Sequence, residues 1–340
     1  MRDRHFGKIA VVAVAMVVVL SCIGSVSFAK APLRVAMVAA GGLGDRSFYD
    51  SGHAGLVRAQ KELGVVTKVL ECKDDPSLYY DQLLAAAQNY DLVFIVPGYQ
   101  MDKEIQELAP QFPKVTFVYI DGTIDVPGVV SVDYAEHEGS FLAGALAAMM
   151  TTRSGIKGID PKTKVIGMVG GMDIPVIRNF LAGYKQGAAA VDPSVKVEVL
   201  YAGTFSDPAK GKELTFALHD KGADIVYQVA AKTGEGVLFA SKEAGHYAIG
   251  VDSDQCYIVP DNIVGSMMKR VDNSVYQTIK YAIEGTLKKG AVYHYGIKEN
   301  GVGLCFCETM QKVVPKDVIE KLRSLEEQIR SGKIKVQEAS

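Results

Sequence analysis

Residues 33–48 read LRVAMVAAGGLGDRSF, an apolar run that passes into a glycine-rich loop. The run Leu33–Ala40 shows no alternation of polar and apolar residues, which predicts a strand buried on both faces. The loop after it is polar and contains three glycines, and a helical pattern begins at Phe48. A buried strand, a glycine-rich loop and a helix in this order are typical of α/β proteins that hold small molecules at the carboxyl ends of their strands.

Residues 1–29 predict a secretory signal peptide. Three basic residues lie within positions 2–8, and an almost unbroken apolar run extends from Ile9 to Leu20. That run is too short to span a bilayer. Small residues favour cleavage after Ala29, whereas the residues around Cys22 resemble a lipoprotein box with lipidation at that cysteine. Both outcomes stay open. Exported α/β proteins of this kind more typically capture a small molecule outside the cytoplasm than process one inside it.

The composition of the chain indicates a soluble globular protein with two domains. Roughly 310 residues follow the signal peptide, which is too many for one ordinary core. Hydrophobic residues make up 48% and charged residues 22%, so disorder is not expected. A net charge of −2 without a basic stripe argues against nucleic acid as a partner. After the signal no second apolar run approaches 20 residues, so we expect membrane contact only through a lipid anchor.

Apolar runs alternate with helical patterns along most of the chain. Runs that are apolar on both faces and joined by helices predict parallel sheets covered on both sides. The pattern occurs twice, separated by the polar segment Thr151–Thr163. The predicted strands of this alternation are Leu33–Ala40, Val65–Glu71, Asp91–Val96, Lys114–Ile120, Val129–Val132, Lys164–Val169, Val195–Tyr201, Asp224–Val229 and Tyr247–Val251.

The order of elements changes after Val251. A strand at Asn262–Val271 and a helix at Asp272–Leu287 precede two β segments, Ala291–Ile297 and Val302–Phe306. We therefore predict an α/β fold of two doubly wound parallel-sheet lobes between which the chain crosses more than once. The N-terminal lobe is expected to comprise residues 30–135 plus 271–290, and the C-terminal lobe residues 136–270 plus 291–340. The expected hinge segments are Asp133–Glu136, Asp254–Tyr257 and Val271, and Arg270 with Asp272 is expected to form a lobe-linking ion pair.

Four cysteines follow the signal peptide, and we expect buried free thiols. A two-domain α/β chain has enough core to dispense with disulfides. Cys305 and Cys307 share one face of a predicted strand and lie too far apart along it to bond easily. No histidines and cysteines occur at zinc-like spacing, so no metal site and no cofactor are expected. The other two of these cysteines are Cys72 and Cys256.

Six motifs in sequence resemble the basic membrane protein family of substrate-binding proteins, whose best-understood members are purine nucleoside receptors of ABC importers. The resemblance covers essentially the whole chain after the signal. It implies the type I periplasmic binding protein fold, with two α/β lobes, three crossovers and a ligand cleft between them. It also implies an ABC transporter permease as partner. The motifs lie at residues 44–48, 136–144, 166–171, 201–211, 250–255 and 266–272.

The loops that follow the predicted strands offer groups suited to a nucleoside-like ligand. A nucleoside presents a flat base, which aromatic faces bind, and a ribose diol, which carboxylates accept from. Asp45 is expected to contact the sugar, or alternatively to cap the helix after it. Phe48 begins that helix and is a candidate for the core as well as the ligand. Tyr49 and His53 lie four residues apart and can face the cleft together.

The second half of the chain supplies further candidates, together with Asp121 in the first half. Asp252 follows a strand and is the preferred partner of the ribose diol. Asp121 bonds the base or sugar, or starts a turn. Lys269 donates to a ligand hydroxyl or pairs with Asp252. The resemblance implies that Phe205 forms one face of a base clamp, and Lys232 places a cation near the cleft.

Four positions depart from the family pattern, one of them Gly44, where a second aspartate is frequent in the family. Nucleoside receptors usually carry asparagine at Tyr49, tryptophan or phenylalanine at His53 and glycine at Lys232, which hints at a ligand somewhat different from an ordinary nucleoside. A flavin, a sugar or a modified base, or a sensing role with a signalling partner, stays open. An enzyme is not expected, because the chain lacks a Gly-x-Ser-x-Gly elbow and a His-Glu-x-x-His motif.

Overall fold

The computed structural model describes residues 31–339. The predicted signal peptide, with its alternative processing at Ala29 or Cys22, lies outside these residues. Leu33–Ser340 form one compact unit. Among the described residues, no helix has both the length and the apolar character that crossing a bilayer requires.

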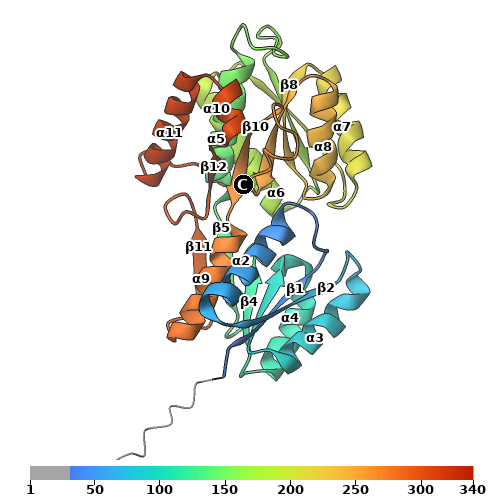
Figure 1. Cartoon of the computed structure of the whole chain (residues 1–340), viewed down its shortest axis with the longest axis vertical. Helices are drawn as coiled ribbons and strands as arrows, with labels where there is room; N and C mark the ends of the chain where they lie inside the picture. The colour runs from blue at the N-terminus through green and yellow to red at the C-terminus, as the bar shows by residue number, and fades with distance from the viewer. Residues whose placement is uncertain (1–30, 340) are drawn as a thin grey trace, which may run out of the picture. The chain divides into compact units, whose positions relative to one another are not determined.

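The first sheet is built from six parallel strands in the order β11-β5-β4-β3-β1-β2 (Figure 1). Its central strands are buried on both faces, as the unbroken apolar runs predict. The strands are β1 (Arg34–Ala39), β2 (Val66–Glu71), β3 (Leu92–Val96), β4 (Thr116–Ile120), β5 (Val130–Tyr134) and β11 (Val292–Tyr295).

The second sheet has the order β12-β10-β9-β8-β6-β7. Its strands are parallel except for β12, which pairs antiparallel with β10 at the edge. The strands are β6 (Val165–Gly170), β7 (Lys196–Tyr201), β8 (Ala223–Val229), β9 (Tyr247–Asp252), β10 (Ile263–Lys269) and β12 (Val302–Cys305).

Helices cover both faces of each sheet, so the predicted doubly wound α/β fold is confirmed. In the first sheet, α3 and α4 pack against one face and α2 and α9 against the other (Figure 1). In the second sheet, α5 and α6 share one core and α7 and α8 another. The helices are α2 (Phe48–Leu63), α3 (Tyr79–Asn89), α4 (Asp102–Leu108), α5 (Glu136–Thr151), α6 (Pro175–Val191), α7 (Pro208–Asp220), α8 (Thr233–Glu243), α9 (Val271–Glu284), α10 (Glu308–Val313) and α11 (Lys316–Arg330), with short 3-10 turns η2 (Pro76–Leu78), η3 (Gly98–Gln100) and η4 (Ala109–Gln111).

Glycines allow the backbones of α5 and α6 to come into direct contact. A Cβ atom at Gly187 would lie 1.9 Å from the carbonyl oxygen of Phe141, and one at Gly183 would lie 2.0 Å from that of His137. Helix α5 is apolar nearly all round and buried along almost its whole length, as expected of a helix enclosed on every side. This packing holds the first turn of α5, which carries Glu136, in a fixed place at the start of the second lobe.

The chain crosses between the two lobes three times. It leaves the first lobe between β5 and α5, returns between β10 and α9, and leaves again between β11 and β12. Residues 291–340 were expected in the C-terminal lobe, but β11 pairs with β5 and extends the first sheet. The last boundary therefore lies after Tyr295. The expected hinge at Asp254–Tyr257 is also corrected, because that segment joins β9 and β10 within the second sheet.

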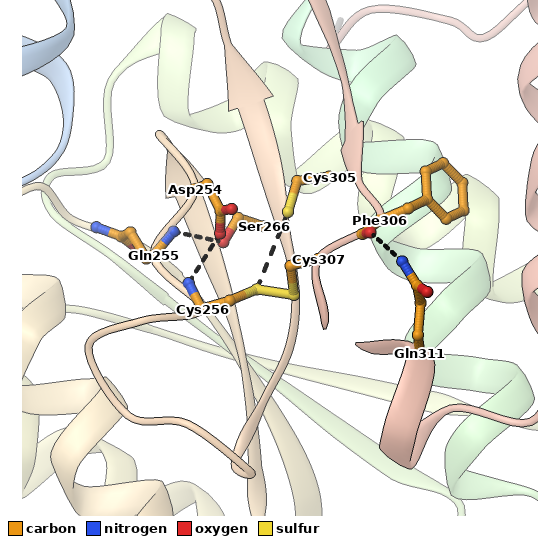
Figure 2. The surroundings of a disulfide bond; sticks show 8 residues. All are labelled: Asp254, Gln255, Cys256, Ser266, Cys305, Phe306, Cys307 and Gln311. Atoms are coloured by element: carbon orange, nitrogen blue, oxygen red, sulfur yellow. Dashed lines mark hydrogen bonds between the residues drawn. A yellow bond between two sulfur atoms is a disulfide. The ribbon is translucent and has the colours of Figure 1, made fainter. Parts of the chain in front are cut away.

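The prediction of free thiols is wrong for two of the four cysteines. Cys256 and Cys307 form a disulfide beside Cys305, which is free and half-buried (Figure 2). Cys72 is free and buried. The expectation that Cys305 and Cys307 do not bond to each other is confirmed. The antiparallel pairing of β12 with β10 brings the segment after β12 beside the loop after β9. That proximity depends on long-range pairing, which spacing along the chain does not reveal.

Candidate ligand-binding cleft

A cavity, here called the central cavity, lies where the carboxyl ends of strands from both sheets converge. Parallel α/β sheets bind ligands at this edge. Each lining residue follows a strand, ends one, or belongs to the first turns of a helix. The lining residues are Phe48, Tyr49, Pro97, Tyr99, Gln100, Asp121, Val176, Ile177, Phe180, Phe205, Val229, Ala230, Ala231, Val251, Asp252 and Lys269.

Six of the nine predicted site residues line the central cavity: Phe48, Tyr49, Asp121, Phe205, Asp252 and Lys269. Asp45 and Lys232 line a second, more polar cavity, the outer cavity, which also contacts Tyr49, Phe205 and Ala231. His53 is half-buried on α2, one turn beyond Tyr49, and is outside the lining of both cavities.

Asp45 organises the first loop. Its carboxylate accepts hydrogen bonds from the backbone N–H groups of Ser47 at 3.0 Å, Tyr49 at 3.0 Å and Asp50 at 3.1 Å. These donors belong to the start of α2, so the alternative role as a helix cap describes the geometry. Burial raises the pKa of Asp45 to about 6, against the effect of the three donors. The position of Tyr49 in the cavity wall therefore depends on this carboxylate.

Asp252 ends β9 with its side chain buried at the boundary of the two lobes. Its carboxylate accepts a hydrogen bond from the Ser47 hydroxyl, which belongs to the first lobe. Burial raises the pKa of Asp252 to about 7, and the Lys269 ammonium opposes that rise. The backbone of Asp252 is in the left-handed region, at φ 63°, and so are those of Asp121 at 79° and Ala231 at 47°. Such strain in non-glycine residues gathers at functional sites.

Lys269 lies at the end of β10 among buried carboxylates. Only 2% of its side chain is exposed, and its ammonium pairs with Asp121 and, at 2.9 Å, with Glu136. Burial opposes the charge of Lys269, but Asp121, Glu136 and Asp252 raise its pKa well above the ordinary value. Burial also raises the pKa of Glu136 to about 8, although Lys269 opposes this. The expected ion pair of Lys269 with Asp252 is wrong, because the ammonium pairs with Asp121 and Glu136 instead.

The network around Lys269 contains more carboxylates than ammonium groups. Buried carboxylate oxygens need hydrogen-bond donors to offset the loss of hydration. Asp252 receives one from Ser47 and retains acceptor capacity on the cavity side. The arrangement is therefore suited to a ligand that presents hydroxyl or N–H donors.

Aromatic rings form the apolar walls of the central cavity. The Lys269 ammonium lies 5.3 Å from the centre of the Phe48 ring and 5.4 Å from that of Phe180, within cation–π range. The ring of Phe205 packs over Gly171, where a Cβ atom would lie 2.1 Å from the ring. Phe205 therefore contacts the loop after β6 and also lines the cavity.

Several lining or supporting residues were not predicted from the sequence, among them Tyr99, Phe180 and Glu136. Tyr99 follows the carboxyl end of β3, so the rule that ligands bind at this edge could have identified it. Phe180 is indistinguishable from a core residue of α6 by periodicity. The sequence marks Glu136 only as part of an expected hinge segment and of the motif at residues 136–144, because its partner Lys269 is more than a hundred residues away.

Direct contacts join the lobes next to the central cavity. The side-chain amide of Gln255 donates to the Arg46 carbonyl oxygen at 3.0 Å, and the Ser253 hydroxyl donates to that of Ser47 at 3.3 Å. The predicted pair of Arg270 and Asp272 is confirmed, with two bonds of 2.8 Å at the crossing from β10 to α9. The lobes are therefore held against each other on the side of the cavity where β9 and β10 end.

The chain is similar in sequence and in structure to several known proteins. Residues 33–340 match the Bmp family, described as "ABC transporter substrate-binding protein PnrA-like". The chain is 31% identical to the "ABC transporter nucleoside-binding protein BmpA" of Lactococcus lactis subsp. cremoris, with 99% of each chain covered. It is 34% identical to an uncharacterized lipoprotein of Pyrococcus abyssi, covering 84% of this chain and 73% of the relative. The crystal structure of an ABC transporter solute-binding protein from Aeropyrum pernix superposes with a TM-score of 0.80 at 29% identity, covering 89% of this chain and 93% of the other.

Proposed function

The chain belongs to the Bmp family of PnrA-like ABC transporter substrate-binding proteins, and we propose that its ligand is a nucleoside or a related aromatic-ring metabolite. Membership confirms the resemblance found in the sequence. It implies a location outside the cytoplasm and a transporter permease as partner.

The observation that carries the proposal is the convergence of carboxylates and aromatic rings in the central cavity. Asp121, Asp252 and Lys269 lie on its polar side, and Phe48, Phe180 and Phe205 form apolar walls. Carboxylates match vicinal hydroxyls, which donate hydrogen bonds, and aromatic faces match a planar base. The 31% identity to a protein named as nucleoside-binding supports the same ligand class.

Each cavity residue has a proposed role. Asp252 accepts from the ribose diol, while Asp121 and Lys269 bond the remaining sugar or base groups. Phe205 stacks on one face of the base, with Phe48 and Tyr49 toward the other. Asp45 acts through the loop that it caps, and Lys232 interacts with ligand groups that extend into the outer cavity. For His53 a ligand contact requires movement of α2 relative to the position described above.

Membership of the family supports a route by which the bound ligand is delivered to a transporter. We propose that the lobes close over the ligand by a hinge motion at the three crossings, and that the closed form docks on the permease of an ABC importer. The protein would act in the periplasm or at the outer face of the cytoplasmic membrane. Relatives named as lipoproteins support a lipid anchor at Cys22 over release after Ala29.

Isothermal titration calorimetry against purine nucleosides, pyrimidine nucleosides, riboflavin and ribose tests the ligand. Saturable one-to-one binding of a nucleoside, with ribose much weaker, is the expected result. Mass spectrometry of the compound released on denaturing the purified protein gives an independent identification. If every nucleoside fails to bind and a sugar binds instead, the proposed ligand is wrong while family membership stands.

A further inference from the structure

A group of sulfur and oxygen atoms lies around the disulfide, apart from the central cavity. It consists of the carboxylate of Asp254 and the sulfur atoms of Cys256, Cys305 and Cys307 (Figure 2). All four ligand-type atoms lie within 4.8 Å of one another. Asp254 and Cys256 come from the loop after β9, Cys305 ends β12, and Cys307 lies in the segment after β12.

The disulfide accounts for only two of the three sulfur atoms. Cys256 is bonded to Cys307, and the Sγ atom of Cys305 lies 3.9 Å from that of Cys256. A covalent link between the two segments needs no third cysteine. A third thiol at this distance is the feature that a purely structural disulfide leaves unexplained.

The spacing of the sulfur atoms fits a tetrahedral metal ion. A Zn–S bond is about 2.3 Å, which places two thiolates on one tetrahedral ion about 3.8 Å apart. Cys256 and Cys305 already have this separation. The Cα atoms of Cys256 and Cys307 are 6.5 Å apart, at the wide end of the disulfide range of about 4.4–6.8 Å. After reduction, rotation of the two cysteine side chains can therefore separate the sulfur atoms to the spacing of metal ligands with little movement of the backbone.

Hydrogen bonds hold the group in place. The Asp254 carboxylate accepts from the backbone N–H of Cys256 at 3.0 Å, and the Ser266 hydroxyl accepts from that of Gln255 at 3.0 Å. Cys305 pairs with Ser266 in the ladder between β10 and β12. Asp254 is exposed and Cys256 is buried, so the group is open to solvent from the carboxylate side. An ion can thus enter a site whose ligands are already positioned.

We propose that the reduced chain binds one thiophilic divalent ion, of the Zn²⁺ class, through Asp254, Cys256, Cys305 and Cys307. A dithiol reductant supplies two electrons and two protons to the disulfide, giving two cysteine thiols and the oxidised, disulfide form of the reductant. The ion then replaces the three thiol protons, which pass to solvent. Under oxidising conditions the disulfide joins the loop after β9 to β12, and under reducing conditions the metal ion makes the same link.

Co²⁺ alone is a suitable probe. The purified chain is reduced with a dithiol under anaerobic conditions, freed of reductant and titrated with Co²⁺, with absorption spectra and metal analysis as readouts. We expect one Co²⁺ per chain, with a near-ultraviolet thiolate-to-cobalt charge-transfer band. The oxidised chain should show no such band.

Variants assign the ligands. Cys305→Ser leaves both disulfide cysteines in place, so it is expected to fold, and circular dichroism checks this. In the reduced state it should bind Co²⁺ at least about tenfold more weakly, with a reduced charge-transfer band. Cys72→Ser, at a buried cysteine of the first lobe, is the matched control and should bind like the parent. Absence of the band in the reduced parent chain, or an unchanged Cys305→Ser variant, would overturn the proposal.

Discussion

The Asp252→Asn substitution should strengthen the fold and weaken ligand binding, with a pH dependence that identifies the cause. The side chain of Asp252 is buried, and burial raises its pKa from 3.8 to about 7. Such a shift of about 3 pKa units corresponds to about 4 kcal/mol between the protonated and ionised forms. Asparagine has the same shape, keeps an acceptor for the Ser47 hydroxyl and carries no charge.

The sign of the effect follows from linkage. A carboxyl whose pKa is raised in the folded state stabilises the fold fully below its unfolded pKa of 3.8, and this contribution is lost as pH rises through about 7. The parent protein should therefore lose stability relative to Asp252→Asn between about pH 4 and pH 7. We expect a gain of about 2–4 kcal/mol for the variant at pH 8 that nearly disappears at pH 4.

Urea unfolding followed by circular dichroism at pH 4, 6 and 8 measures this difference, since the chain has no tryptophan for fluorescence. Asp125→Asn, in the exposed part of the loop between β4 and β5, is the matched control and should show little pH-dependent difference. In Asp252→Asn, loss of a charge-assisted hydrogen bond should weaken nucleoside binding at pH 8 by about 10–100-fold. A variant that is less stable than the parent at pH 8, or equally shifted at every pH, would refute the reasoning.

Three further substitutions test the cleft and the core. Phe205→Ala should weaken ligand binding by about tenfold or more in calorimetry, and its unfolding free energy should change by less than its binding free energy. Phe239→Ala, at an exposed ring on α8, is the control and should change neither quantity. Equal losses of affinity in the two variants would argue against the base clamp. Lys269→Met leaves Asp121 and the neighbouring carboxylates buried without their cation, so the melting temperature at pH 8 should fall by an amount equivalent to about 3–5 kcal/mol. Adding Glu136→Gln should restore part of this loss. An unchanged melting temperature in Lys269→Met alone would contradict the buried network. Gly187→Ala inserts a methyl group against the backbone of α5 and should cost several kcal/mol in urea unfolding, on the order of other overpacked cores; wild-type stability would show that the two helices can separate freely.

Local sequence patterns were sufficient for most of the fold. Strands such as β3 and β6 are apolar on both faces, and this alone places them inside a parallel sheet covered by helices. Parallel topology then puts the residues after the strands at one edge, which is why Asp121 and Asp252 were found without coordinates. The helix expected to begin at Phe48 begins there, and the helix expected at Asp272–Leu287 matches α9 to within a few residues.

Contacts between segments far apart in the sequence decided the remaining features of the fold and the site. The residues that make these contacts are not marked by the sequence immediately around them. The edge strand β11 could join either sheet until its pairing with β5 was known. Glu136 became part of the cleft network only through Lys269, and Cys256 met Cys307 only because β12 runs antiparallel to β10. Asp45 shows a related limit: its residue type allowed a ligand contact or a cap, and only the positions of three backbone N–H groups show that it caps the helix. Periodicity and turn chemistry act over a few residues, whereas these contacts depend on where separate elements lie after the core has packed.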